Sequence, residues 1–130
     1  METYRAAIVG LTGIGSGRPS AHPLAAAPRS HAAAYLHHPR TDLVAVCDKN
    51  SAVLDQFRET WQDVWPDIKY YRDYREMLES AQPDLLSIAT SDHAHAEIAV
   101  KGALGSPRAI LCEKPIATTL ADADRMIAAC

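Results

Sequence analysis

Residues 4–15 read YRAAIVGLTGIG, an apolar run that passes directly into a glycine-rich turn. The run does not alternate polar with apolar residues, which is typical of a strand covered on both faces, as in a parallel sheet. Similar runs occur at 42–48 (DLVAVCD), 84–90 (DLLSIAT) and 109–115 (AILCEKP), and a weaker one at 68–71 (IKYY). We therefore expect a strand in each of these five segments.

Helical patterns fill the intervals between these segments. Each expected helix begins at or just after a residue whose side chain can cap a helix N-terminus. The expected caps are Ser30, Ser51, Asp73 or an adjacent residue, Asp92, and Thr119. Strict alternation of strand and helix predicts a doubly wound α/β sheet of Rossmann-like type, because right-handed crossovers place helices on both faces.

The length of the chain, 130 residues, predicts a single domain over 1–130 with a core of its own. Its content of 48% hydrophobic and 22% charged residues is ordinary for a folded globular protein. Residues 16–30 (SGRPSAHPLAAAPRS) contain three prolines and predict an irregular insertion between the first strand and its helix.

Charge and cysteine content argue against several classes of function. A net charge of −3 without a dense Lys/Arg block predicts no nucleic-acid and no membrane partner. Three cysteines without paired spacing predict reduced thiols and no zinc site, and His93 and His95 point to different sides of a helix. The sequence shows no secretory signal pattern and no apolar run long enough to span a bilayer, so we expect a cytoplasmic protein.

The turn after the first strand is spaced like a loop that holds the phosphates of a dinucleotide. Such a loop needs small residues for a tight turn, for close approach to phosphate and for helix packing, and these positions fall on Gly10, Thr12 and Gly15. The Thr12 side chain either crowds a phosphate or hydrogen-bonds to it, while Gly13 and Ile14 complete the loop. A mobile turn is the alternative, because the pattern alone is weak evidence.

Asp48 ends the second expected strand, where a carboxylate can bind the hydroxyls of an adenosine ribose. Thirty-eight positions separate Gly10 from Asp48, more than the usual interval of about 20, and the insertion holds the excess. A carboxylate repels a 2′-phosphate and so favours NAD over NADP, although the adjacent Lys49 weakens this preference. The alternative for Asp48 is a turn residue that ends a strand.

The insertion leaves two interpretations of the phosphate site. In an ordinary dinucleotide fold the first helix directs its positive end at the phosphates, but here the convincing helix begins near Ser30. Either residues 13–17 form a short first turn, or the loop amides alone bind phosphate. Arg18 is a candidate for compensating charge, with a solvated arginine as the alternative.

Two later stretches, SIATSDHAHAEIAVKGAL (87–104) and ILCEKPIATTLADADRMI (110–127), are more specific. Together with the glycine loop they resemble the N-terminal domain of the Gfo/Idh/MocA oxidoreductases, over essentially the whole chain apart from 16–30. The resemblance implies a cofactor-binding domain of NAD-dependent enzymes that act on sugars, polyols or related hydroxy compounds.

The same resemblance assigns roles to residues at the ends of the later strands. In the family the fourth strand commonly ends in Thr-Pro followed by a histidine, and the matching positions here are Thr90, Ser91 and His95, with Ser91 in place of the proline. The family's Glu-Lys-Pro motif is matched by Glu113, Lys114 and Pro115. Family knowledge implies that Lys114 approaches the reactive end of the cofactor and the substrate hydroxyl, where a cation stabilises developing charge on oxygen.

Members of that family are longer and carry a second α/β domain with the substrate pocket. We expect this chain to lack that domain, to be inactive as a dehydrogenase by itself, and to expose apolar surface that can promote self-association. A dinucleotide-sensing regulator or an interaction module with the same fold is the alternative function. Lys114 favours the enzyme, because a sensor needs no hydride-transfer lysine, whereas Thr12 and the insertion favour the interaction module.

Overall fold

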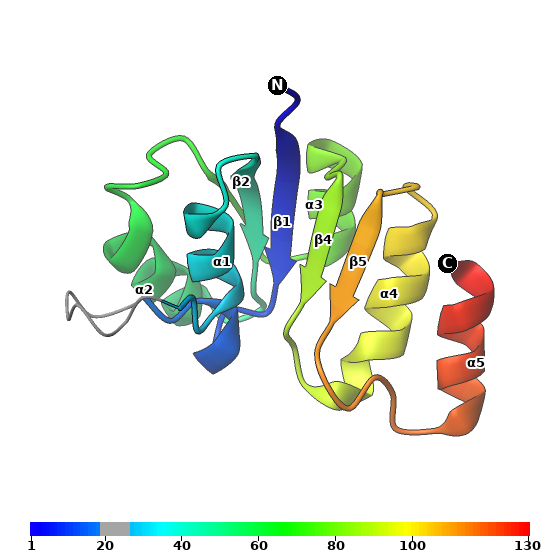
Figure 1. Ribbon diagram of the computed structural model, residues 1–130. Helices are drawn as coiled ribbons and strands as arrows, with labels where there is room; N and C mark the ends of the chain where they lie inside the picture. Colours follow the sequence, from blue (N-terminus) through cyan, green and yellow to red (C-terminus); the bar gives the residue numbers. More distant parts are fainter. Residues whose placement is uncertain (19–26) are drawn as a thin grey trace.

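The computed structural model describes residues 1–18 and 27–130, and in it five parallel strands form one sheet in the order β3-β2-β1-β4-β5 (Figure 1). The strands are β1 (Tyr4–Val9), β2 (Thr41–Cys47), β3 (Lys69–Tyr71), β4 (Leu85–Ile88) and β5 (Ala109–Cys112). The α-helices are α1 (His31–His37), α2 (Ser51–Trp61), α3 (Tyr74–Ala81), α4 (His95–Ala103) and α5 (Leu120–Ala129). The doubly wound α/β sheet expected from the sequence is therefore confirmed.

Strand β1 lies at the centre of the sheet and is buried on both faces. Ala6, Ala7 and Ile8 have no exposed surface. Ala6 and Ile8 pack in one layer with Phe57 and Trp61 of α2, whereas Ala7 packs in the opposite layer with residues of α3 and α4. Two covered faces explain why the strand carries no polar alternation.

Three of the expected helix caps are present. The side chains of Ser30, Asp73 and Thr119 each accept a hydrogen bond from a backbone N–H in the first turn of α1, α3 and α5. The expected cap at Ser51 is wrong: Asn50 accepts from the Ala52 N–H at 3.0 Å, and Ser51 is the first helical residue. Asp92 begins a 3₁₀ turn, η2 (Asp92–Ala94), which continues into α4.

The base of the predicted insertion is held in place by hydrogen bonds to its surroundings. The Trp61 indole N–H donates to the Ser16 carbonyl at 2.8 Å, and the Ser30 hydroxyl donates to the Gly17 carbonyl. Residues 19–26, which make up most of the insertion, lie outside the described residues. The Arg18 guanidinium forms an ion pair at 2.7 Å with Asp63, which follows α2. This ion pair directs the guanidinium away from the glycine loop.

The turn after β1 requires glycine at two positions because backbone passes very close to it. A Cβ at Gly10, where φ is +91°, would lie 2.6 Å from backbone atoms of Ala89 and Thr90 at the end of β4. A Cβ at Gly15 would lie 2.2 Å from the Gly10 carbonyl oxygen. The turn is thus packed against the neighbouring strand end.

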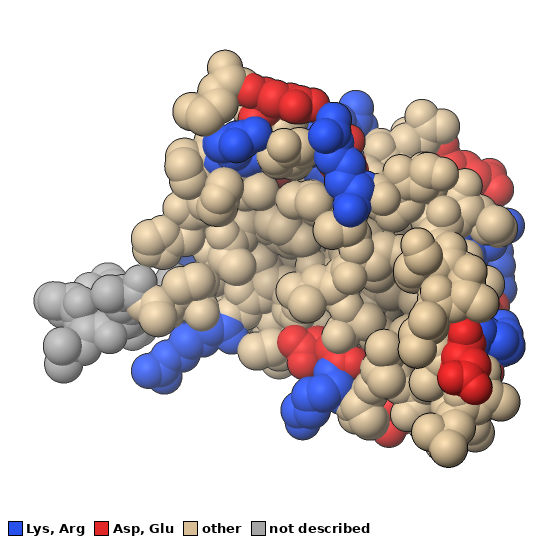
Figure 2. All heavy atoms as spheres, turned by 45° about the vertical axis from the view of Figure 1, so that its right-hand side comes forward, with Lys and Arg blue, Asp and Glu red and all other residues tan. Residues whose placement is uncertain are grey.

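The β5 side of the molecule carries exposed apolar side chains at the edge of the sheet. Leu111 on β5 and Ile127 on α5 are 58% and 71% exposed. In Figure 2, which turns this side forward, the charged side chains lie mostly around the margin. The expected self-association rests on this surface and stays a prediction. Within the described residues, no helix is long and apolar enough to cross a membrane.

We predict that Gly10→Ala lowers the free energy of unfolding by about 2–5 kcal/mol, because it combines a clash against backbone with a left-handed conformation that alanine disfavours. Urea denaturation followed by circular dichroism measures the change. Gly17→Ala is the matched control, since a Cβ there would meet its nearest atom at 3.5 Å, an ordinary contact. Equal stability of the Gly10→Ala variant and the wild type would contradict the close approach of β1 and β4.

Candidate functional site

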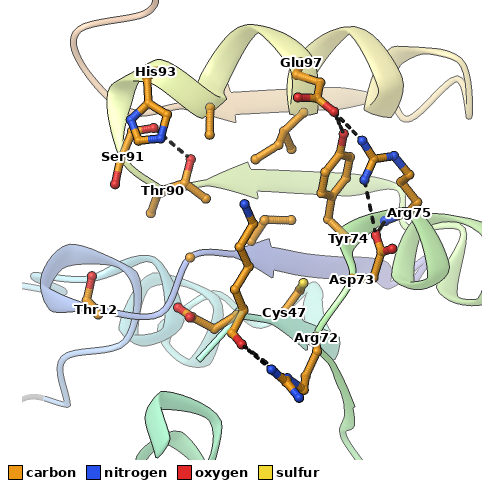
Figure 3. A pocket seen from close by; sticks show the side chains of 17 residues that line it. Thr12, Cys47, Arg72, Asp73, Tyr74, Arg75, Thr90, Ser91, His93 and Glu97 are labelled. Carbon is orange, nitrogen blue, oxygen red and sulfur yellow. Dashed lines mark hydrogen bonds and ion pairs between the residues drawn. The ribbon is translucent and has the colours of Figure 1, made fainter. Parts of the chain in front are cut away.

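A cleft of about 570 Å³ lies at the carboxyl ends of β2, β1 and β4. It is lined by residues that follow these strands and by the first turns of α3 and α4 (Figure 3). Of the residues predicted from the sequence, the cleft brings together Gly10, Thr12, Asp48 and Thr90. A crevice at the carboxyl ends of parallel strands is the usual position for a ligand in an open α/β sheet.

A second cavity, of about 520 Å³, lies at the opposite end of the sheet. Its lining includes Arg5, Trp65 and Lys69, and none of the site residues predicted from the sequence. The chemistry expected from the sequence therefore gathers at one end of the sheet only.

The glycine loop continues into a short 3₁₀ turn, η1 (Gly13–Gly15). Its first hydrogen bond runs from the Gly15 N–H to the Thr12 carbonyl at 3.1 Å, so the N–H groups of Gly13 and Ile14 precede it. The structure thus contains the short turn of the first interpretation, and phosphate binding at it stays a prediction. Among the described residues, a Cβ at Gly13 would meet no atom within 4 Å, so the loop is open at this point.

Asp48 accepts two backbone hydrogen bonds, one from the glycine loop and one from its own turn. Its Oδ2 accepts from the Leu11 N–H at 3.1 Å and its Oδ1 accepts from the Asn50 N–H at 2.9 Å. Each carboxylate oxygen keeps a second lone pair for a ligand hydroxyl. Asp48 thus links β2 to the loop and presents a carboxylate to the cleft.

The far wall of the cleft is built by α3 and α4. The Tyr74 hydroxyl donates to Glu97 at 2.8 Å, the Arg75 guanidinium pairs with the same carboxylate, and that guanidinium lies 4.7 Å from the centre of the Tyr74 ring (Figure 3). Burial, together with the hydrogen bond to Glu97, raises the pKa of Tyr74 to about 12. The phenol therefore stays protonated and remains a donor to Glu97.

The cleft floor includes the Cys47 thiol at the end of β2. Burial and the nearby Asp48 carboxylate raise the pKa of this thiol to about 12. A thiol with such a pKa is a poor nucleophile at neutral pH. Cys47 therefore contributes packing to the cleft and no reactive group.

His95 is buried and does not itself line the cleft, although it contacts Thr90, which does. Its Nδ1 lies 2.8 Å from the Pro115 carbonyl oxygen and its Nε2 lies 3.0 Å from the Thr90 carbonyl oxygen. The ring therefore joins the turn after β4 to the turn after β5. The geometry gives His95 a supporting position behind the site rather than direct contact with a ligand in the cleft.

The Glu-Lys-Pro turn follows β5, the next strand beyond β4, and does not line the cleft. Lys114 and Pro115 are exposed, and Glu113 is partly buried. Glu113 accepts a hydrogen bond from His31 Nε2 at 2.9 Å, and this bond lowers the pKa of its carboxyl below the ordinary value. Three strand spacings separate the Asp48 and Glu113 ends of the sheet, which amounts to about 14 Å.

Sequence reasoning missed two groups of residues. The first group lines the cleft and consists of Arg72, Tyr74, Arg75 and Glu97. The first three of these follow the weak strand IKYY, and that position at a strand end could have indicated that they belong to the site. His31 was missed because its partner Glu113 lies 82 positions away, and no local pattern reports such a contact.

Comparison with known proteins finds relatives that are named as dehydrogenases. The inositol 2-dehydrogenase of Salmonella typhimurium strain LT2 is 35% identical over 92 residues, which cover 68% of this chain and 25% of that protein. The D-apiose dehydrogenase of Paraburkholderia graminis is 36% identical over 102 residues, covering 78% of this chain and 26% of the relative. The chain thus spans about a quarter of the length of these curated relatives.

The fold has a close counterpart among solved structures. The WlbA dehydrogenase from Bordetella pertussis, solved in complex with NADH and UDP-GlcNAcA, superposes with a TM-score of 0.79 at 25% identity, covering 99% of this chain and 34% of that one. A family model described as an oxidoreductase family with an NAD-binding Rossmann fold matches residues 4–130. The resemblance inferred from the sequence motifs is confirmed, and the chain belongs to the Gfo/Idh/MocA oxidoreductase family.

Proposed function

We propose that this chain binds NAD in the cleft at the carboxyl ends of β2, β1 and β4. In this proposal it forms the cofactor-binding portion of an oxidoreductase that transfers hydride between nicotinamide and a sugar, polyol or related hydroxy compound. Membership in a family with an NAD-binding fold supports the cofactor class. The names of the inositol and apiose dehydrogenases among the relatives support the substrate class.

The position of Asp48 carries the proposal. Its carboxylate lines the same cleft as Gly10 and Thr12. One dinucleotide could therefore place its ribose hydroxyls at Asp48 and its phosphates at the glycine loop. The N–H groups at the start of η1 supply donors for phosphate, and the open space at Gly13 admits it. Asp48 disfavours a 2′-phosphate because two negative charges would be brought together, which supports NAD as the cofactor.

Lys114, in the turn after β5, supplies the side chain that takes part in the proposed hydride transfer. Nicotinamide, when bound, supplies the acceptor or donor of hydride. When an alcohol is oxidised, the neutral amine of the exposed Lys114 would accept the hydroxyl proton as hydride leaves carbon, and in the reverse direction the Lys114 ammonium would return that proton to the carbonyl oxygen. The side chain would exchange this proton with solvent between turnovers. This role favours an enzyme over a dinucleotide sensor, in which a lysine at this turn has no task.

We predict that the wild-type chain binds NADH at least about tenfold more tightly than NADPH, a difference of about 1.4 kcal/mol. Asp48→Asn removes the negative charge while retaining the side-chain shape, so the preference should fall toward equal affinity. Isothermal titration of each variant with both cofactors measures the ratio. Asp55→Asn is the matched control: it makes the same charge change on the exposed face of α2 and should leave the ratio unaltered.

Two outcomes would contradict this assignment. A wild-type preference for NADPH would show that Lys49 or Arg72 governs the site rather than Asp48. An Asp48→Asn variant with an unchanged cofactor ratio would show that the carboxylate does not meet the ribose.

We also predict that the 130-residue chain alone binds NADH without catalysing substrate oxidation. In this proposal the cofactor fills the cleft, and the second cavity lies at the opposite end of the sheet, where it cannot bring a substrate to Lys114. Absorbance at the NADH band, recorded with the chain, NAD and either myo-inositol or a pentose, should stay flat over hours. Substrate-dependent formation of NADH by the purified chain would contradict this expectation.

A further inference from the structure

A continuous series of hydrogen bonds leads from the protein interior to the Glu-Lys-Pro turn. It joins the side chains of Tyr35, Ser87, His31 and Glu113. The Tyr35 hydroxyl lies 2.7 Å from Ser87 Oγ, and Ser87 Oγ lies 3.0 Å from His31 Nδ1. His31 Nε2 in turn lies 2.9 Å from Glu113 Oε1. The contacts join α1, the middle of β4 and the residue after β5, across sequence separations of 52, 56 and 82 positions.

The chemistry of Glu113 sets the direction of these hydrogen bonds. An ionised carboxylate only accepts, so His31 Nε2 carries the ring proton and donates it to Glu113. In the neutral ring, His31 Nδ1 accepts from the Ser87 hydroxyl, and because Ser87 has a single proton to give, it accepts from Tyr35. Burial raises the pKa of Tyr35, so the phenol stays protonated. All donors therefore point toward Glu113, an arrangement in which each bond strengthens the next.

Ser87, His31 and Glu113 are hydrogen-bonded in the same order as the nucleophile, base and acid of a hydrolase triad. The burial of Ser87 excludes that role. Ser87 has no exposed surface, and its hydroxyl lies between Tyr35 and His31 within the fold. A nucleophile must reach its substrate. The three side chains therefore serve an internal purpose.

The far end of the hydrogen-bonded chain is the backbone of Lys114. Glu113 Oε2 accepts from the Lys114 N–H at 3.3 Å, while the Glu113 N–H donates to the Ile88 carbonyl at 2.9 Å. Resting on the proposed function, we infer that His31 is a positioning residue: it holds the Glu113 carboxylate against the Lys114 N–H and so fixes the direction in which the Lys114 side chain leaves the turn.

Burial distinguishes His31 from its partners in this role. The side chain of His31 is 5% exposed, whereas that of Glu113 is 28% exposed and Lys114 is exposed. Without His31, water would compete for the Glu113 carboxylate, which would then be free to take other rotamers. The buried His31 ring, which is held by α1 and by Ser87 of β4, therefore restrains a turn that otherwise faces solvent.

The test compares two ligands that differ only at the reactive end: NADH, and ADP-ribose, which lacks nicotinamide. His31→Leu should weaken NADH binding by about tenfold, equivalent to about 1.4 kcal/mol, and should leave ADP-ribose affinity within about twofold. His31→Gln should restore most of the loss, because its amide nitrogen can donate to Glu113 from near the Nε2 position. A general structural defect would weaken both ligands alike.

A double-mutant cycle shows whether His31 acts through Lys114. Lys114→Ala should itself reduce NADH affinity, and His31→Leu should have little further effect in that background. Additive effects of the two substitutions would contradict the positioning role.

Tyr35→Phe keeps the inference testable if His31→Leu does not fold, as judged by urea denaturation. It removes only the donor to Ser87 and should produce a smaller loss in the same direction, for NADH alone. Tyr4→Phe is the control, since the Tyr4 hydroxyl accepts from Arg40 and takes no part in this chain of hydrogen bonds.

The outcomes separate the inference from the proposed function. If the wild type binds neither ligand, the proposed function fails and the positioning role fails with it. If the wild type binds both ligands and the His31 and Tyr35 variants keep the ratio of the two affinities, the proposed function stands and the positioning role is overturned.

Discussion

The close approach of two strand ends is the constraint on which the rest of the site depends. The turn after β1 passes so near the end of β4 that only glycine fits at position 10, and position 15 must be glycine because it faces the Gly10 carbonyl. This packing brings the loop, the Asp48 carboxylate and Thr90 to one edge of the cleft. A bulkier turn would separate β1 from β4 and divide the cleft.

The site has two ends that are stabilised by different means. At the β2 end, the Leu11 N–H holds Asp48 against the glycine loop, and the Asn50 N–H holds its other carboxylate oxygen within the turn after β2. At the β5 end, two buried histidines hold the exposed turn from opposite sides: His31 through Glu113, and His95 through the Pro115 carbonyl. Lys114, for which we propose a chemical role, thus lies on a surface turn whose supports are internal, a common way to combine access with precise placement.

The sequence predicted the fold well because its signals are local. Unbroken apolar runs, and caps such as Ser30 and Thr119, report strand burial and helix starts within a few residues. Ser51 was a wrong choice of cap because Asn50, one position earlier, has equal capping chemistry. The Glu-Lys-Pro motif predicted a functional turn only through resemblance to a family, since a lone motif of this kind is ordinary in a surface turn, and its function stays a prediction.

The parts of the site that sequence reasoning missed depend on distant contacts. His31 was one more residue in an alanine-rich helix until the fold placed it beside Glu113 and Ser87. Likewise, Tyr74 and Glu97 become a wall of the cleft only when α3 and α4 pack together. Arg18 was considered for phosphate binding on charge alone, whereas the fold pairs it with Asp63.

The most direct test of the account is to map bound NAD by the backbone amide signals of the chain in nuclear magnetic resonance. We predict saturable shifts at Gly10, Thr12, Asp48 and Thr90, with little change around the opposite cavity near Arg5 and Lys69. Shifts concentrated at that opposite cavity, or no shifts from a folded chain at saturating NAD, would contradict a dinucleotide site at the carboxyl ends of the strands.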